Sequence, residues 1–193
     1  MSSPGDEIGF IQAIQAEPES DSLVRIYADW LEERGDVRAQ YLRLMLSPPV
    51  PNGDLKKLRE HIDPAWLSLW LRARLRVGRG AIMGMDYPIY EGANYIGTDS
   101  RVVDIDLTPQ QPWFTQPPNH TNWAGNWGSA DDPVRCYPLH AMVACREGKL
   151  SIEDLRSPGF TFVSRRRVHP GQPEPLQAND VIQIGNVQLR VLL

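Results

Sequence analysis

The sequence predicts an α+β fold of two domains, with a small N-terminal helical bundle followed by an all-β sandwich that carries a long inserted loop. Apolar residues recur at helical spacing near the N-terminus, whereas short apolar runs with a period near two dominate after Leu75. Gly and Pro also become more frequent there, as expected for strands joined by turns. A length of 193 residues is sufficient for two domains. We therefore expect a helical domain over residues 1–74 and a β-sandwich over residues 75–193.

The first domain is expected to contain four or five helices. The clearest apolar stripe follows one helix face and consists of Leu23, Ile26, Tyr27, Trp30 and Leu31. Serines before this stripe and Gly35 after it mark the ends of that helix. Shorter stripes predict one helix that ends near Pro18, and another whose inward residues are Val37, Tyr41, Leu44 and Met45. Asp63 and Pro64 predict the start of a last helix, whose inward face is Trp66, Leu67, Trp70 and Leu71.

The second domain is expected to consist of short strands divided by Gly, Pro and Asp turns. The expected strands are residues 77–85, 87–92, 94–97, 102–107, 140–148, 149–155, 159–164, 165–170, 180–186 and 187–193. A series of short strands of this kind, without helices between them, indicates an all-β sandwich.

Charge and hydropathy argue against several classes of function. The net charge of −4 gives no basic footprint for nucleic acid, and no long run of Lys and Arg suggests a membrane surface. The N-terminus lacks the pattern of a signal peptide, and no stretch approaches the ~18 consecutive apolar residues of a membrane span. Cys136 and Cys145 are too few for a disulfide framework. These features predict a cytoplasmic protein.

A helical motif in the first domain carries a family resemblance. Residues 27–36 read YADWLEERGD and are followed by an L-x-R-L-like end. Residues from about 8 to 46 resemble the bacterial repeat-companion domain, and the resemblance implies a short helical module without an established catalytic role. The acidic residues of this helix could form a docking face for a basic partner, although exposed charge is the ordinary state of a helix surface.

Five ordered blocks of the second domain carry a more specific resemblance. The blocks are residues 96–98 (IGT), 104–107 (DIDL), 137–141 (YPLHA), 154–163 (DLRSPGFTFV) and 179–185 (NDVIQIG). Their order and spacing resemble the forkhead-associated (FHA) domain, a β-sandwich that reads phosphothreonine. The resemblance covers residues from about 75 to 193 and implies the same fold for them.

The resemblance also implies where a ligand would bind, and most of the family's phosphate-binding residues are replaced. Thr98 stands where the family has a phosphate-binding Arg, and Tyr137 stands where it has a Ser. Gly159 replaces the Asn that grips the peptide, whereas Gly97 and His140 match residues that shape the loops. Because charged hydrogen bonds contribute about 1.5–3 kcal/mol each, we expect the usual phosphate-dependent binding to be lost.

Other arginines could restore a phosphate site of different geometry. Arg101, Arg135 and Arg156 fall in or beside the loops that build the family's binding edge, although solvated loop arginines are common. The run at residues 165–167 is expected at the opposite end of the sandwich, because a strand separates it from these loops. The expected binding edge comprises Thr98, Arg101, Arg135, Tyr137, Arg156, Ser157 and Gly159.

A long loop at residues about 109–132 stands where the family has a short connection. Trp113, Trp123 and Trp127 indicate that this loop packs against something, because aromatic residues are depleted in disordered segments. The loop could fill the peptide groove, recruit the helical domain or present an aromatic surface to another protein.

No catalytic residue, metal or cofactor is expected. The pattern Cys136-x3-His140-x4-Cys145 lacks the paired spacing of a structural zinc site, and no G-x-S-x-G motif is present. The sequence favours a non-enzymatic adaptor with a degenerate FHA-like domain, whose partner is a protein or peptide rather than nucleic acid or membrane. Two alternatives stay open. One is phosphothreonine-peptide binding through non-standard arginines in Ser/Thr kinase signalling, and the other is a structural subunit of a larger assembly.

Overall fold

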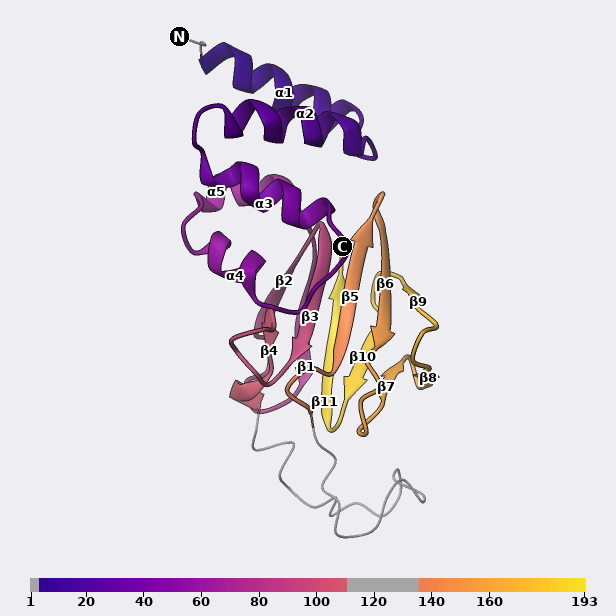
Figure 1. The fold of residues 1–193 in the computed structure, drawn as a ribbon. Helices are drawn as coiled ribbons and strands as arrows, with labels where there is room; N and C mark the ends of the chain where they lie inside the picture. The colour runs from indigo at the N-terminus through magenta and orange to yellow at the C-terminus, as the bar shows by residue number, and fades with distance from the viewer. Residues whose placement is uncertain (1–3, 111–135) are drawn as a thin grey trace, which may run out of the picture.

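The computed structural model describes residues 4–110 and 136–193. Within these ranges, α-helices at the N-terminal end are followed by two β-sheets that pack face to face (Figure 1). This arrangement confirms the predicted α+β fold, with a helical region ahead of a β-sandwich. None of the helices in the described part of the chain combines the length and apolar character needed to cross a lipid bilayer.

The helical region packs around its own aromatic core. Its elements are α1 (Pro4–Ala16), α2 (Asp21–Glu32), α3 (Val37–Leu46), α4 (Asp54–Arg59), α5 (Pro64–Leu67) and the 3-10 turn η1 (Ser68–Trp70). Tyr27 and Leu31 of α2 and Tyr41 of α3 are completely buried there. The indole Nε1 of Trp66 donates a hydrogen bond of 3.0 Å to the hydroxyl of Tyr27, so the last helix is tied to the second one.

The buried face of α2 differs from the predicted stripe. Ile26 is 54% exposed, and the inward residues are Val24, Tyr27, Ala28 and Leu31. These four also follow the i, i+3, i+4, i+7 spacing of one helix face, and packing between α2 and α3 selects them. In α3, Val37 is likewise 39% exposed, while Ala39 and Leu42 join Tyr41 and Met45 in the core.

The last helix begins as predicted and ends early. The side chain of Asp63 accepts a hydrogen bond of 2.8 Å from the Ala65 amide, and Pro64 occupies the first turn. The helix ends at Leu67, and strand β1 begins at Leu71, inside the segment that the sequence assigns to helices. The spacing of buried residues changes there from the helical period to a period of two. Buried Ala73, Leu75 and Val77 alternate with exposed or half-buried arginines.

Two sheets build the sandwich. The strands are β1 (Leu71–Arg79), β2 (Asp86–Tyr90), β3 (Gly92–Gly97), β4 (Ile105–Asp106), β5 (Ala141–Arg146), β6 (Lys149–Asp154), β7 (Thr161–Val163), β8 (Arg166–Val168), β9 (Glu174–Leu176), β10 (Val181–Ile184) and β11 (Val187–Leu192). Their order is β2-β1-β11-β10-β7-β8 in one sheet and β4-β3-β5-β6-β9 in the other. The inward side chains of both sheets form one continuous apolar core.

Three strand predictions need correction. The segment 80–85 turns between β1 and β2 instead of extending a strand, since its Gly80 and Gly84 suit a turn. Only Ile105–Asp106 of the expected strand 102–107 pairs, in parallel with the end of β3. Strand β9 at Glu174–Leu176 was not expected, because Pro173 precedes it and Pro175 lies within it. Proline is tolerated in edge strands, and β9 is at the edge of its sheet.

Candidate functional site

Three loops gather at the end of the sandwich that lies away from α1 and α2 (Figure 1). They are residues 98–104 between β3 and β4, residues 136–140 before β5, and residues 155–160 between β6 and β7. Strands β3 and β6 run antiparallel to β5 between them, so both end where β5 begins. We call these three loops the apex. It contains the predicted binding residues that fall within the described ranges.

Gly97 joins the first two apex loops. A Cβ atom at Gly97 would lie 2.1 Å from the carbonyl oxygen of Pro138, so only glycine allows this approach. The Thr98 amide donates to the carbonyl oxygens of Tyr137 (3.1 Å) and Pro138 (3.2 Å), and the Asp99 amide donates to Pro138 (3.1 Å). The loop-shaping role that the sequence assigns to Gly97 has a direct steric basis here.

His140 joins the second and third loops and is completely buried. Its Nδ1 accepts a hydrogen bond of 3.2 Å from the Tyr137 amide. Its Nε2 lies 3.1 Å from the Phe160 carbonyl oxygen and 3.1 Å from Ser157 Oγ. A carbonyl oxygen can only accept, so the proton resides on Nε2. Burial lowers the pKa of His140, which keeps the ring neutral in this network.

Asp154 organises the third loop from the end of β6. Its carboxylate accepts from the Ser157 amide (2.8 Å), Ser157 Oγ (2.7 Å) and Thr161 Oγ1 (2.8 Å). The hydroxyl proton of Ser157 is therefore committed to Asp154, and its oxygen faces the Nε2 proton of His140. This direction is opposite to that of a nucleophilic serine, which must donate to its histidine. Ser157 is also buried, so its hydroxyl stabilises the loop instead of facing solvent.

Arg101, one of the candidate phosphate ligands, is already paired within its own loop. Its Nε and Nη2 donate to the two oxygens of Asp99 at 2.8 Å and 2.7 Å. These hydrogen bonds lower the pKa of Asp99 to about 2. A phosphate at the apex would have to compete with this carboxylate for Arg101.

Arg156 is an arginine of the apex that has no partner among the described residues. It is exposed, and it forms no hydrogen bond or ion pair with any residue in the described ranges. Its φ of 61° lies in the left-handed region, which is unusual for a residue with a side chain. The bonds from Ser157 to Asp154 hold the next turn of the loop in place. Gly159, which follows in the loop, is half-buried.

The expected position of the arginine run at 165–167 is wrong for Arg167. Strand β7 covers only Thr161–Val163, and β8 returns beside it with Arg167 opposite Phe162. The guanidinium carbon of Arg167 lies 3.7 Å from the centre of the Phe160 ring. Arg167 therefore reaches the third apex loop, because the hairpin is shorter than the sequence suggests.

The helical region supports the first apex loop from the side. Lys56 Nζ of α4 donates to the carbonyl oxygen of Ser100 at 2.7 Å. A Cβ atom at Gly53, whose φ is 74°, would lie 1.9 Å from the carbonyl oxygen of Arg101. The chain before α4 thus packs directly on the loop.

Several predicted residues lie outside the described ranges. They are the loop residues Trp113, Trp123 and Trp127 and the candidate ligand Arg135, and they stay predictions. Of the described part of the inserted loop, Gln110 is buried and its Oε1 accepts from the Ile82 amide at 2.9 Å. Among the described residues, no group of His, Cys, Asp and Glu could hold a metal ion.

Three residues of this site were not predicted from the sequence: Asp99 in the first apex loop, and Asp154 and Thr161, which border the third loop. Asp99 stands two positions before Arg101, a spacing that could have indicated a local ion pair. Asp154 and Ser157 have the spacing of a carboxylate that caps a turn, which was also readable. Thr161 could not be found in this way, because its contact with Asp154 depends on the path of the whole loop.

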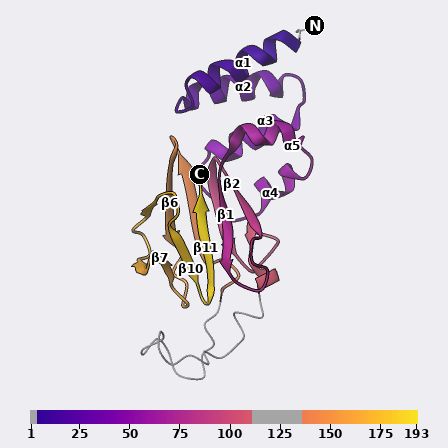
Figure 2. The same ribbon diagram turned by 180° about the vertical axis from the view of Figure 1, so that it is seen from behind.

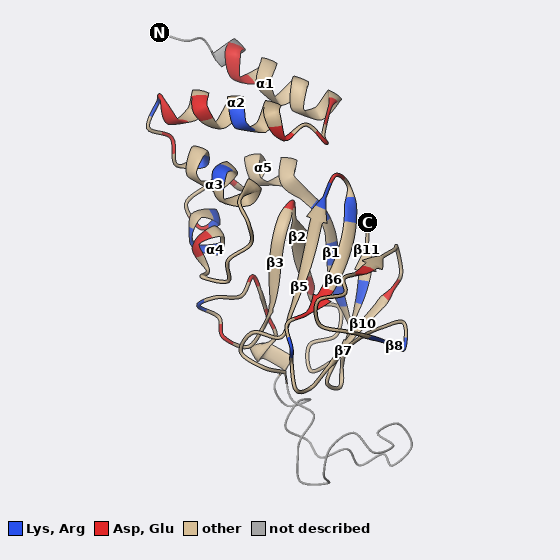
Figure 3. Ribbon diagram, turned by 45° about the vertical axis from the view of Figure 1, so that its right-hand side comes forward, with Lys and Arg blue, Asp and Glu red and all other residues tan. Residues whose placement is uncertain are grey.

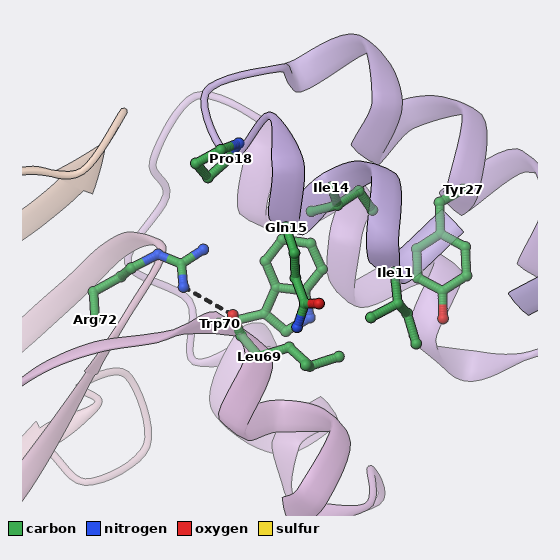
Figure 4. Close-up of a pocket in the computed structure, with 8 residues that line it drawn as sticks. All are labelled: Ile11, Ile14, Gln15, Pro18, Tyr27, Leu69, Trp70 and Arg72. Atoms are coloured by element: carbon green, nitrogen blue, oxygen red, sulfur yellow. Dashed lines mark hydrogen bonds between the residues drawn. The ribbon is translucent and has the colours of Figure 1, made fainter. Parts of the chain in front are cut away.

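An apolar cleft of about 200 Å³ lies at the other end of the molecule, between α1 and the start of β1 (Figure 4). The Nε1 of Trp70, which lines it, has no hydrogen-bond partner in the described part of the chain, but this atom is fully covered. An acceptor placed in the cleft would not reach it. Arg72 at the cleft already donates to Glu91 (2.7 Å) and to the Leu69 carbonyl (2.8 Å). We therefore assign no ligand to this cleft.

Comparison with known proteins finds similarity in the β-sandwich region. Residues 129–185 match the family model of the FHA domain. The chain is similar to the FHA domain of a Chlamydia trachomatis protein, at 20% identity over 63% of this chain and 97% of that chain, with a TM-score of 0.45. It is also similar to the FHA domain of an Arabidopsis thaliana hypothetical protein, at 18% identity over 64% of this chain and 86% of that chain, with a TM-score of 0.48.

A third similar structure comes from a study of phosphothreonine-dependent FHA domain interactions, at 21% identity over 63% of this chain and 95% of that chain, with a TM-score of 0.44. No curated protein matches the chain. The predicted FHA resemblance of the second domain is confirmed by the family model. The resemblance of residues 8–46 to the repeat-companion domain, and the division at residue 74, stay predictions.

Proposed function

We propose that this protein is a non-enzymatic adaptor whose apex binds a protein or peptide partner without depending on phosphate. The FHA domain is a protein-interaction module, and the family match over residues 129–185 supports that general role. One of the similar structures was determined in a study of phosphothreonine-dependent interactions, so the dependence on phosphate is the point that must be tested.

The proposal depends on Thr98, which stands where a phosphate-binding arginine is expected, and on the pairing of Arg101, the described arginine of the same loop, with Asp99. A phosphothreonine brings close to two negative charges and three strong acceptor oxygens, which require charged donors. Thr98 offers one neutral hydroxyl, and Arg101 beside it is paired with Asp99. The hydroxyl of Ser157 is buried and donates to Asp154. Tyr137 places its ring 6.1 Å from His140 rather than presenting a small hydroxyl.

The test is a binding comparison between matched peptide libraries that contain either threonine or phosphothreonine at a fixed position. The full-length chain is immobilised, and enrichment of each library is measured. We expect no preference for the phosphorylated library. A preference of about tenfold or more would correspond to one charged hydrogen bond and would contradict the proposal.

Arg156 favours a second candidate, in which the apex retains phosphothreonine binding through a non-standard arginine. Its exposure and its lack of a described partner leave its guanidinium available for an anion. If this candidate is correct, the phosphorylated library is preferred and Arg156→Ala abolishes the preference. Arg165→Ala, which removes an exposed arginine from the β7–β8 turn, is the matched control and should have no effect.

A further inference from the structure

The outer face of the six-stranded sheet is uncovered in the part of the chain that the structure describes. Figure 2 shows β1, β11 and β10 side by side on this face, with α1, α2 and α3 beyond one end of the strands and α4 beside the β2 edge of the sandwich. Ala73, Leu75 and Val77 of β1 point into the sandwich core. Alternation along the strand therefore places Arg74 and Arg76 on the outer face.

Arginines of neighbouring strands meet on this face. Arg76 of β1 lies directly opposite Arg190 of β11 in the antiparallel register. Both are exposed, and Arg74 stands two residues from Arg76 on the same strand and the same side. We call Arg74, Arg76 and Arg190 the arginine face. Like charges directly opposite each other across a strand pair are destabilising, so this arrangement costs stability in the free protein.

One carboxylate neutralises only part of this charge. Asp86 of β2 lies opposite Arg76 and accepts from its Nε and Nη2, each at 2.7 Å. The hydrogen bonds from Arg76, together with the nearby charge of Arg74, lower the pKa of Asp86. Arg74 and Arg190 themselves form no ion pair or hydrogen bond with a described residue. Figure 3 shows the basic positions along β1 and β11. The face is positive on a chain whose net charge is −4, so it does not follow from overall composition.

The geometry of the face defines the chemistry of a partner. Residues two apart on a strand are separated by roughly 6.6 Å, and directly opposite residues by about 5 Å. An extended segment with acidic residues at alternate positions presents carboxylates at the same repeat. A guanidinium can bind a carboxylate with two parallel hydrogen bonds, which favours arginine over lysine for such a contact.

We propose that the arginine face is a docking surface for an extended acidic segment of a partner protein, with carboxylates at alternate positions. The opposed pair Arg76 and Arg190 is unfavourable in the free protein and is relieved when the acidic segment binds. This surface is separate from the apex, so its function does not depend on whether the apex recognises phosphate.

The test uses the full-length chain and a fluorescein-labelled peptide in which Glu and Ser alternate, with binding measured by fluorescence anisotropy at low salt. A peptide with Gln in place of Glu is the neutral control. We expect Arg190→Glu and Arg74→Glu each to weaken binding by about tenfold or more. Arg25→Glu makes the same change of charge at an exposed position of α2, and we expect it to weaken binding less than about twofold.

A stability measurement separates the proposal from simple damage to the fold. Arg190→Glu converts the opposed pair into a favourable one with Arg76, so we expect the Tm to rise by roughly 1–3 °C. Loss of binding together with a higher Tm is the signature of a surface held for function. A lower Tm would contradict the stated repulsion and overturn the proposal.

Three further results would overturn it. The first is equal weakening by Arg25→Glu, which would show a response to net charge alone. The second is tighter binding of a single-stranded or duplex oligonucleotide than of the acidic peptide at the same salt concentration. The third is concentration-dependent self-association that Arg190→Glu abolishes, because the occupant would then be a second copy of the chain.

Discussion

Arg59 and Asp104 form a buried ion pair that joins the helical region to the apex. Arg59 Nη1 lies 2.6 Å from Asp104 Oδ1, and the two side chains are only 11% and 7% exposed. The other oxygen of Asp104 accepts from the Tyr95 amide at 2.8 Å. The guanidinium carbon of Arg59 also lies 4.4 Å from the centre of the Tyr90 ring. The pair holds the residue that ends the first apex loop.

Breaking this pair is expected to destabilise the protein strongly. Arg59→Met should lower the free energy of unfolding by about 3–5 kcal/mol, because it leaves the carboxylate of Asp104 buried without its cation. Asp104→Asn should have a comparable effect, because it leaves the buried guanidinium of Arg59 without its carboxylate partner. The double variant should lose less than the sum of the two. Urea denaturation of the single and double variants measures this coupling.

An exposed ion pair provides the control for this cycle. Arg43 of α3 pairs with Asp29 and Glu32 of α2, and its side chain is 47% exposed. Arg43→Met should change the midpoint of urea denaturation little, because water screens this pair. Strict additivity of Arg59→Met and Asp104→Asn would contradict the interaction between them.

The apex network predicts that stability falls in mild acid. Burial lowers the pKa of His140 below its ordinary value near 6.5, so the folded state binds fewer protons than the unfolded state between the two values. The stabilisation is complete above the unfolded pKa and is lost as the pH falls towards the folded one. The Nδ1 atom accepts from the Tyr137 amide, and protonation would place two donors face to face. Thermal unfolding at a series of pH values below 7 measures the slope.

His140→Gln should flatten this pH dependence while lowering stability at neutral pH, since the network is then incomplete. His169→Gln is the matched control, because His169 is exposed in the β8–β9 connection, where it bridges to Gln172. An unchanged slope in His140→Gln would show that another group causes the acid sensitivity.

Local signals in the sequence were reliable where one short segment determines the structure. The start of α5 depends on the Asp63 side chain and on Pro64, and both are readable without tertiary information. Gly97 and His140 also lie in short motifs, and in the structure each contacts a second apex loop. The strand after residue 70 was harder to predict, because the apolar residues between Trp66 and Leu71 fit a helix until the alternation of β1 begins.

Tertiary contacts decided the remaining features. Ile26 and Val24 are both apolar, and only the placement of α3 determines that Val24 is buried. Arg101 was a plausible phosphate ligand in the sequence, but the turn of its loop brings it onto Asp99. Arg59 and Asp104 are separated by 45 positions in the chain, so no local pattern could indicate their contact.

A single substitution at the apex tests whether the missing cation accounts for the proposed loss of phosphate dependence. Thr98→Arg places a guanidinium where the FHA resemblance expects one, and the Thr98 side chain is only half-buried. We expect binding of the phosphothreonine library to improve by about tenfold or more over the unphosphorylated one. Thr98→Gln, which has similar reach without charge, should give no such preference. If Thr98→Arg shows none either, the shape of the apex also excludes phosphate.

The surroundings of Gly97 and Gly9 predict that substitution by alanine has opposite effects on stability at these two glycines. Gly97→Ala should lower the free energy of unfolding by about 1–3 kcal/mol, because its Cβ would lie 2.1 Å from a carbonyl oxygen that must then move. Gly9 lies in α1 with no atom within 4 Å of an added Cβ. Gly9→Ala should therefore stabilise the protein by about 0.5–1 kcal/mol through helix propensity. Urea denaturation of both variants measures the difference, and a neutral Gly97→Ala would mean that the two apex loops can separate at little cost.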